Sequence, residues 1–368
     1  MGKMDFGKQA RNLVDRIRAY GNILIYIQGS PDPDGLASAF LFKLICEGLE
    51  RQAAIVSANP PSLPQNIRLI RDLQLPVQFH LPPGQVKKYD AYVILDFQSV
   101  SAEGITGVIP CLAHIDHHEK TKEELPVDFS LVLEDAGSTS GILVRLFREM
   151  GIEVGKKSWR RAATALYYGI QTDTDNFSHA TALDRESLSY LEPRVDKRCL
   201  SRIASLPISG EAVDFLRMAA RHQVVIQRWL IAGVGFIEED HRDNLALVAD
   251  LLLKRAGIET VVVFGLIRRP GGLTLDASLR TRDRELDLNR LIKDLVRNGG
   301  ARHYKGAFQV NLDFFVHAPD PDRLWEMVRD TTINALRGKI REVTPSRFGH
   351  LIQGLWKRVT GLFSRRGS

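Results

Sequence analysis

The chain has 368 residues, of which 44% are hydrophobic and 26% are charged, and its formal net charge at pH 7 is +6. This length favours two domains, and the composition is ordinary for a globular protein. No apolar run approaches the roughly 20 residues that cross a bilayer. The N-terminal residues lack the apolar stretch of a signal peptide, and the 3 widely spaced cysteines argue against a disulfide framework or a zinc site. These features predict a cytoplasmic protein.

Hydrophobic periodicity in the first half of the chain predicts strands that alternate with helices. The predicted helices cover residues 8–20, 36–49, 140–150 and 158–170. The predicted strands cover residues 23–27, 53–56, 77–79, 91–95 and 112–115. Such alternation is typical of a mostly parallel sheet with helices on both faces. We therefore predict an α/β domain over residues 1–191.

A second set of elements follows a linker and connecting helix, which we place at residues 192–227. The connecting helix is predicted to cover residues 210–227. Further helices are predicted at 243–256, 287–297 and 320–337, strands at 229–237, 260–267, 273–280 and 308–316, and a Gly-rich turn at 299–306. These elements predict a smaller α/β domain over residues 228–340, followed by a basic tail at 341–368.

Acidic residues stand where the predicted elements of the first domain end. Asp32 and Asp34 follow one buried strand and Asp96 follows another. Asp116-His117-His118 follows a third strand, and Asp173 lies at the end of a helix. Taken singly, each residue is more often a turn former or a helix cap. Because open α/β sheets place their sites at the carboxyl ends of strands, the joint pattern predicts a divalent-metal site for Mn²⁺ or Mg²⁺.

The spacing of these residues suits two ions. Asp32 and Asp34, separated by one residue, can point at different ions, and the two oxygens of Asp96 can bridge them. Two such ions generate a hydroxide nucleophile and neutralise phosphate charge. His117 offers a neutral nitrogen ligand, whereas His118 can donate to a phosphoryl oxygen.

These motifs resemble the DHH phosphoesterase superfamily, specifically its DHH–DHHA1 branch, over about residues 8–337. In the first domain the matching segments are Ser30 to Gly35, Leu95-Asp96, Asp116-His117-His118, Ser138-Thr139-Ser140 and Gly169 to Thr174 with Phe177. In the second domain they are Ser278 to Thr281, Asp287-Leu288-Asn289 and Gly299 to His303. The resemblance implies an α/β fold in which a DHH domain and a DHHA1 domain enclose an active-site cleft.

The resemblance also implies roles for individual residues. Asp32 and Asp96 would hold one metal ion, Asp34, Asp96, His117 and Asp173 would hold the other, and Asp96 would bridge them. Asp116 and His118 complete the catalytic set with Asp96: His118 would contact substrate phosphate and Asp116 would orient a histidine. Asp175 lies outside the family pattern, and a turn role suits it better.

One position departs from the pattern. The family's first motif usually begins with a histidine four residues before its first aspartate, and Gln28 stands there. An amide oxygen is a weaker Mn²⁺ ligand than imidazole, so the first ion is expected to be held less tightly. All the carboxylates remain, which favours an active enzyme over a protein with an impaired centre.

In the second domain, Arg280 and the segment Gly299-Gly300-Ala301-Arg302-His303 form a candidate anion cradle. The family's histidine corresponds to either Arg302 or His303. Without the resemblance, Gly299 and Gly300 are better explained as a helix C-cap. In the first domain, Ser138 and Thr139 are candidate phosphate donors at a helix N-terminus, and ordinary helix capping explains them equally well.

The basic excess gathers near the end of the chain, where eight Lys and Arg residues stand against one acid, Glu342, from Arg337 onward. Apolar residues recur there at helical spacing, at Leu351, Leu355, Val359 and Leu362. The tail could contact a membrane surface or RNA, although packing on its own domain is commoner. A homodimer is left open.

The sequence as a whole predicts a Mn²⁺-dependent phosphoesterase with two ions, with Mg²⁺ as the alternative metal. The resemblance implies short nucleotide substrates: short oligoribonucleotides, 3′-phosphoadenosine 5′-phosphate, or cyclic and linear dinucleotides. Two other interpretations stay open. One is a nucleotide-binding sensor whose Gln28 centre does not turn over, and the other is an exopolyphosphatase or pyrophosphatase-like enzyme.

Overall fold

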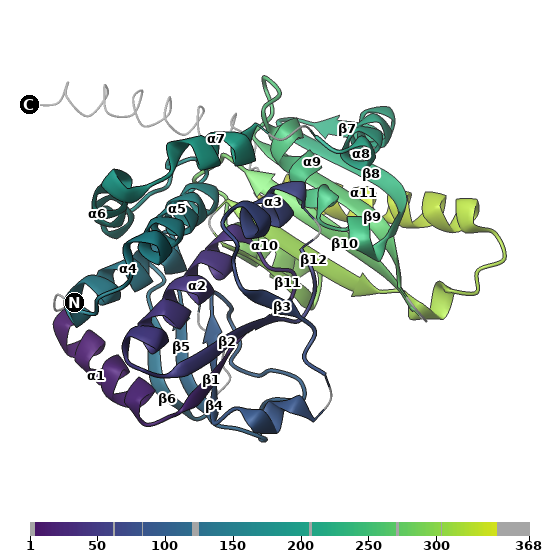
Figure 1. Cartoon of the computed structure of the whole chain (residues 1–368). Coiled ribbons are helices and arrows are strands. Elements are labelled where there is room, and N and C mark those ends of the chain that lie inside the picture. The colour runs from purple at the N-terminus through teal and green to yellow at the C-terminus, as the bar shows by residue number, and fades with distance from the viewer. Residues whose placement is uncertain are drawn as a thin grey trace, which may run out of the picture. The chain divides into compact units, whose positions relative to one another are not determined.

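The computed structural model describes residues 4–61, 63–82, 84–119, 125–205, 208–269, 272–302 and 304–343. The chain divides into two compact units, residues 1–207 and residues 208–368. Each unit has its own six-stranded sheet and its own hydrophobic core (Figure 1). This arrangement confirms the predicted α/β fold class, with a parallel sheet in the first unit and a second α/β sheet domain after it.

The sheet of the first unit is entirely parallel and has the strand order β3-β2-β1-β4-β5-β6. Its strands are β1 (Asn22–Ile27), β2 (Gln52–Ser57), β3 (Val77–Phe79), β4 (Ala91–Leu95), β5 (Cys111–Asp116) and β6 (Val127–Val132). The order reverses between β1 and β4, and in such sheets ligands bind outside the carboxyl ends of the strands at that point. Strand β6 was not predicted, although its apolar and polar residues alternate as they do in a half-buried strand.

The α-helices of the first unit pack into a single core with the strands. They are α1 (Phe6–Arg18), α2 (Pro33–Gly48), α3 (Pro64–Asp72), α4 (Thr139–Met150), α5 (Lys156–Asp173), α6 (Ala182–Leu191) and α7 (Lys197–Ala204). The opposite face is covered by the 3₁₀ helix η1 (Gln85–Lys88) and residues 98–110. The expectation of α-helices on both faces is therefore wrong for the described residues, because the connections before and after β4 form a short 3₁₀ helix and loops instead.

The two helices that frame the candidate site begin with side-chain caps. The N-cap of α2 is Asp32, whose carboxylate accepts the N–H of Gly35, and Pro33 stands in the first turn. The N-cap of α4 is Ser138, whose hydroxyl accepts the N–H of Gly141. Both caps satisfy backbone donors that a helix start leaves free. The loops after β1 and before α4 thus have defined backbone conformations.

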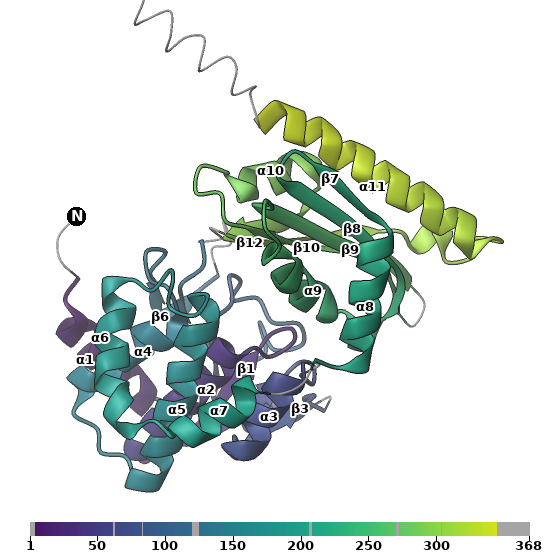
Figure 2. The ribbon, with the colours of Figure 1, turned by 90° about the horizontal axis from the view of Figure 1, so that it is seen from above.

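The second unit contains a mixed sheet with the strand order β11-β12-β10-β9-β8-β7, in which only β8 and β9 run parallel among the pairs described. Its strands are β7 (Gln223–Ile226), β8 (Trp229–Glu238), β9 (Thr260–Arg269), β10 (Gly272–Thr281), β11 (Asn298–Arg302) and β12 (Lys305–Asn311). Helices α8 (Gly210–Arg221) and α9 (Asn244–Leu253) pack on one face. Helices α10 (Leu288–Leu295) and α11 (Pro321–Val343) pack on the other (Figure 2).

Three expectations for the second unit are corrected. The helix expected at 210–227 ends at Arg221, and β7 follows it. The Gly-rich segment 299–306 is not a turn but a hairpin of β11 and β12. The strand expected at 308–316 ends at Asn311, and the 3₁₀ helix η4 (Asp313–Phe315) follows. In each case the bounds of the element depend on pairing with a neighbouring strand. Hydrophobic periodicity within the segment does not predict that pairing.

A cavity of about 280 Å³ lies within the second unit, between strands β10 and β12 and helix α11. Its lining is almost wholly apolar and includes Phe308, Val310, Leu312 and Val328. Within the described part of the chain, no helix combines the length and the apolar character that crossing a bilayer requires. The tail predicted at 341–368 lies outside the described residues from position 344 onward.

Candidate metal centre

The candidate residues gather where the strand order of the first sheet reverses. Asp32 and Asp34 follow β1, at the start of α2, and Asp96 directly follows β4. Asp96 has a φ of 58°, so its backbone adopts the left-handed conformation that turns the chain sharply after the strand. Asp116 is the last residue of β5, followed by His117 and His118. Residues from three neighbouring strands thus meet at one edge of the sheet.

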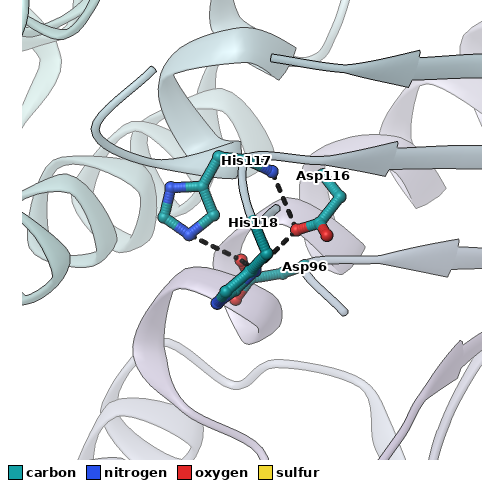
Figure 3. Close-up of side chains that lie close together, drawn as sticks. All are labelled: Asp96, Asp116, His117 and His118. Carbon is teal, nitrogen blue, oxygen red and sulfur yellow. Dashed lines mark hydrogen bonds and ion pairs between the residues drawn. The ribbon is translucent and has the colours of Figure 1, made fainter. Parts of the chain in front are cut away.

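His117 lies at the centre of this group and is fully buried. Its Nε2 atom is 2.9 Å from Oδ2 of Asp173 and 3.3 Å from Oδ1 of Asp96. Asp173 is the last residue of α5, so this contact joins a helix end to a strand end. Figure 3 shows the imidazole of His117 directed at the carboxylate of Asp96.

Two groups of side chains could hold an ion. In the first, one ligand atom each of Asp34, His117 and Asp173 lies within 4.8 Å of the others. In the second, the same holds for Asp96, Asp116, His117 and His118. His117 belongs to both. Together these groups contain six residues that the sequence assigned to metal binding or catalysis: Asp34, Asp96, Asp116, His117, His118 and Asp173.

Asp32 approaches the cluster from the start of α2. A Cβ atom placed on Gly35 would lie 3.3 Å from Oδ1 of Asp32 and 3.5 Å from Oδ2 of Asp96. Oxygens of both carboxylates therefore lie near the same point beside the backbone of Gly35. Carboxylate oxygens are the donors that a hard divalent cation prefers.

His118 is fixed by Asp116. Oδ1 of Asp116 accepts a 2.7 Å hydrogen bond from Nδ1 of His118 and a 2.8 Å bond from the backbone N–H of His117. The two imidazoles meet edge to face, with ring centroids 4.5 Å apart. With Nδ1 engaged, Nε2 of the half-buried His118 is the nitrogen left to meet a substrate.

The electrostatics of the cluster favour a bound cation. Desolvation by the surrounding protein, followed by the charges of Asp96 and Asp173, raises the pKa of Asp32 to about 8, although part of this residue is exposed. Burial and the same two charges raise the pKa of Asp34 well above its ordinary value. Without a cation, the cluster relieves its repulsion by retaining protons. A divalent ion would supply that positive charge instead.

The histidines respond to the same surplus of negative charge. Burial opposes protonation of His117, but the contacts with Asp173 and Asp96 outweigh it and raise the pKa of His117 well above its ordinary value. Burial likewise opposes protonation of His118, but Asp116 outweighs it, so the pKa of His118 is also raised. Burial of Asp116 is outweighed by its hydrogen bond from His118, and the pKa of Asp116 is lowered.

Comparison with known proteins agrees with this geometry. A family model described as the DHH family, N-terminal domain, matches residues 22–170, which contain every candidate ligand except Asp173. Uncharacterized protein MJ1633 of Methanocaldococcus jannaschii is 31% identical over 324 residues, which cover 87% of this chain and 64% of that protein. Residues 22–170 therefore form a DHH-family N-terminal domain. The chain spans 64% of the length of that relative.

Among solved structures, the chain is similar to an exopolyphosphatase-related protein from Bacteroides fragilis, with a TM-score of 0.65 and 14% identity. This match covers 92% of this chain and 97% of the solved one, and it shows a shared fold. RecJ in complex with Mn²⁺ from Thermus thermophilus matches with a TM-score of 0.49, 12% identity and coverage of 92% and 55%. That score is too low to support an argument about this chain.

Gln28, which stands where the family usually has a histidine, is half-buried at the end of β1. Its side-chain nitrogen donates a 2.9 Å hydrogen bond to the backbone carbonyl of Ser99, in the loop after β4. The amide therefore links the loops after two neighbouring strands. Its oxygen is the atom that would face a metal if Gln28 takes the role of the family's histidine.

Ser138 and Thr139, expected to bind phosphate, have protein partners. The hydroxyl of Ser138 donates to Asp184, and both residues are fully buried. The N–H of Thr139 donates to Asp34 and its hydroxyl donates to Asp96. The N-terminus of α4 therefore already holds a carboxylate. A phosphate-binding role for these two residues stays a prediction, and they take part in the site through its carboxylates.

Asp184 was missed by the reasoning from sequence. Its carboxylate accepts hydrogen bonds from the N–H groups of Gly137 and Thr181 and from the hydroxyls of Ser138 and Thr181. The capping box formed by Thr181 and Asp184 at the start of α6 is a local signal that could have drawn attention to it. The link to α4 spans more than 40 residues and has no local signal. Asp175 has a φ of 49° in the turn after α5, as a turn role requires.

The candidate anion cradle of the second unit is described in part. Arg280 lies in β10, and its guanidinium donates to Asp250, to the hydroxyl of Ser278 and to a backbone carbonyl. Gly299 and Gly300 pair with Phe308 and Ala307 of β12, so the helix C-cap explanation is wrong. The side chain of Arg302 and the whole of His303 lie outside the described residues, so the register of this motif stays a prediction.

Proposed function

We propose that this chain is a Mn²⁺-dependent phosphoesterase that hydrolyses phosphodiester or phosphomonoester bonds of short nucleotides. The observation that carries the proposal is the meeting of His117 with the carboxylates of Asp34, Asp96 and Asp173 at the reversal point of a parallel sheet. Oxygen ligands with one or more imidazoles suit Mn²⁺, and Mg²⁺ is the alternative. The match of residues 22–170 to the DHH family, N-terminal domain, supports the same reaction class.

The proposed ligand sets follow the positions of the side chains. Asp34, Asp96, His117 and Asp173 would hold one ion. Asp32 and Asp96, whose oxygens lie near the same point beside Gly35, would hold the other, with Gln28 as a further candidate. Bound together, two such ions activate water as a nucleophile and offset the charge of the phosphate.

The remaining roles belong to His118 and Asp116. The raised pKa of His118 favours its protonated form, in which Nε2 can donate a hydrogen bond to a phosphoryl oxygen. As the reaction proceeds, charge grows on that oxygen and the hydrogen bond strengthens. Asp116 keeps the ring oriented through Nδ1 and stabilises its positive charge.

The nucleotide preference rests on the second unit and on the family resemblance. Gly299 and Gly300 lie in the edge strand β11, where the backbone is open to an approaching ligand. Arg280 belongs to the same candidate cradle, and its guanidinium is paired with Asp250. These features support a small anionic substrate. We also propose a cytoplasmic location, which the three buried free cysteines support.

Two alternative functions are tested in the same experiment as the proposed one. A sensor with an impaired centre is suggested by Gln28 itself, because an amide oxygen binds Mn²⁺ less well than the imidazole that the family usually has there. Polyphosphate hydrolysis is suggested by the name of the exopolyphosphatase-related structure that shares this fold.

The test is to assay the purified protein with Mn²⁺ on a linear dinucleotide, on 3′-phosphoadenosine 5′-phosphate and on inorganic polyphosphate. We expect hydrolysis of at least one nucleotide and loss of that activity in Asp96→Asn. Cleavage of polyphosphate alone would replace the nucleotide proposal. Metal binding without turnover on any of the three substrates would support the sensor.

A further inference from the structure

Two carboxylates of the candidate metal centre, Asp34 and Asp96, accept hydrogen bonds from the start of helix α4. We propose that the first turn of α4, pinned by Asp184, fixes Asp34 and Asp96 in the orientation that binds metal, so that Thr139 and Asp184 are positioning residues. This inference rests on the proposed metal-dependent function and concerns its ligands. It assigns a role to residues that contact no reacting atom.

The first step is the contact between α4 and Asp34. Oδ2 of Asp34 accepts the N–H of Thr139 at 2.7 Å, and Oδ1 accepts the N–H of Ser140 at 2.9 Å. These donors are the first two N–H groups of the helix, which have no partner within it. Two bonds, one to each oxygen, leave the carboxylate little freedom to rotate. Asp34 is fully buried, so the geometry is not relaxed by water.

The second step extends the same turn to Asp96. The hydroxyl of Thr139 donates a 2.9 Å hydrogen bond to Oδ1 of Asp96. That oxygen is also the one 3.3 Å from Nε2 of His117. Thr139 therefore holds Asp34 through its backbone and Asp96 through its side chain. One residue sets the relative orientation of two candidate ligands that come from different strands.

The third step is the anchoring of the turn by Asp184. Its carboxylate accepts the N–H of Gly137 at 3.0 Å and the hydroxyl of Ser138 at 2.8 Å, and it accepts two further bonds from Thr181. The hydroxyl of Ser138 also accepts the N–H of Gly141, so Ser138 connects Asp184 to the first turn of α4. A buried carboxylate with four donors is costly to disturb. The turn that carries Thr139 is thereby held at both ends.

Glycines make room for this arrangement. A Cβ atom on Gly137 would lie 2.2 Å from Oδ2 of Asp184, and one on Gly141 would lie 2.6 Å from Oδ1. A Cβ atom on Gly169 would lie 2.9 Å from the hydroxyl of Ser140 and 3.1 Å from Cα of Asp34. Gly169 precedes Asp173 by one turn of α5. The close approach of α5 at this point therefore also places the third candidate ligand.

Orientation by peptide dipoles has an electrostatic consequence. A lysine or arginine at this position would fix a carboxylate and also neutralise it. The N–H groups and the hydroxyl of α4 fix Asp34 and Asp96 while leaving their full charge available to a cation. The helix start thus orients two ligands at a smaller cost in metal affinity than a salt bridge would impose.

The decisive experiment compares Thr139→Val with Thr139→Ser in the full chain. Valine keeps the size and the backbone N–H but removes the hydroxyl that holds Asp96, whereas serine keeps the hydroxyl. We expect the Mn²⁺ dissociation constant, measured from the free-Mn²⁺ electron paramagnetic resonance signal, to rise by about 10-fold or more in Thr139→Val, as for other groups that support a ligand. Thr139→Ser should restore most of the affinity. Equal affinity in wild type and Thr139→Val would overturn the proposal.

Two further variants complete the design. Thr332→Val removes a buried helical threonine hydroxyl from the second unit and should leave Mn²⁺ affinity unchanged. Asp184→Asn should weaken Mn²⁺ binding while circular dichroism shows a folded protein, and wild-type affinity in that folded variant would remove Asp184 from the proposal. If Asp184→Asn does not fold, the two Thr139 variants decide. Wild-type protein that binds Mn²⁺ but hydrolyses no nucleotide defeats the proposed function and leaves this inference standing on the binding data.

Discussion

The two units of this chain treat buried charge in opposite ways. In the second unit, Asp276 is buried at 2% exposure but pairs with Arg242 and accepts hydrogen bonds from Thr274 and Gln309. In the first unit, the ion-pair partners described for the clustered carboxylates are histidines, and Asp34 is held by neutral N–H groups. The charge of Asp276 is therefore compensated, whereas the cluster of the first unit has surplus negative charge.

This difference in charge compensation indicates which carboxylates would gain stability from a bound cation. A buried carboxylate that already has a guanidinium gains little from a cation. Carboxylates that raise one another's pKa gain a great deal, because a cation replaces both the retained protons and the repulsion. The uncompensated group lies at the carboxyl ends of β1, β4 and β5, where parallel sheets place their sites. Charge balance therefore separates the clustered carboxylates of the first unit from Asp276 of the second.

The strongest way to break this comparison is Asp96→Asn. The substitution removes the carboxylate that both proposed ions share, so we expect hydrolysis to fall below about 1% of wild type, beyond the ~10–100-fold cost of losing a group that only supports a ligand. In metal-free protein the same change removes a like charge from the cluster, and the melting temperature should rise. Activity assays and metal-free thermal melts check both parts. An active variant, or one less stable without metal, would contradict the role assigned to Asp96.

Metal binding should stabilise the protein strongly. At a Mn²⁺ concentration of about 100 times the dissociation constant, the free energy of unfolding should rise by about 2.7 kcal/mol. Chelation should remove this gain together with the activity. Thermal or denaturant unfolding with and without chelator measures it. If Mn²⁺ does not change the melting temperature, the clustered carboxylates of the first unit do not bind this ion.

Two glycines of the second unit test whether its stability depends on close packing rather than on a bound cation. A Cβ atom on Gly299 would lie 2.6 Å from Cβ of Phe308 and 2.7 Å from Cγ2 of Ile292, so Gly299→Ala should cost about 1–3 kcal/mol of stability. Gly338, in α11, has nothing within 4 Å of its Cβ position. Gly338→Ala is the matched control and should stabilise the protein by up to ~1 kcal/mol. Equal effects of the two substitutions in denaturant unfolding would contradict the described hairpin packing.

The pH dependence follows from Asp32. Its pKa is about 8 in the folded protein and 3.8 as the ordinary value, so between these values the folded state holds a proton that the unfolded state has released. The metal-free protein should therefore lose stability as pH rises from about 4 to 8. Mn²⁺ binding must displace that proton, so Mn²⁺ affinity should rise over the same interval. Calorimetry in buffers of different ionisation enthalpy detects the released proton, and binding without proton release would contradict the shift.

The smallest expected effect is that of Gln28→His, which restores the family's usual residue. Imidazole is the better Mn²⁺ ligand, so we expect half-maximal activity at a severalfold lower Mn²⁺ concentration. Gln28→Ala is the control, because it removes the contact with Ser99 without adding a ligand. A large gain from an inactive wild type would instead favour the sensor.

The sequence by itself determined where chemistry can occur. Apolar runs ending in Asp32, Asp96 and Asp116 predicted strands whose carboxyl ends meet, and the structure has these strands at β1, β4 and β5. The caps of α2 and α4 were equally readable from Asp32 and Ser138. These signals are local, because periodicity and capping involve residues a few positions apart.

Only the tertiary structure decided which partners these residues have. The N–H groups of α4 donate to Asp34, about a hundred positions earlier in the chain, and Asp184 anchors the turn before α4 from the start of α6. The hairpin of β11 and β12 likewise replaced an expected turn, because strand pairing supplied partners that the Gly-rich segment lacks on its own. Such contacts depend on how helices and strands pack, and their energies come from burial and hydrogen bonds between distant segments. No pattern within a short stretch of sequence records them.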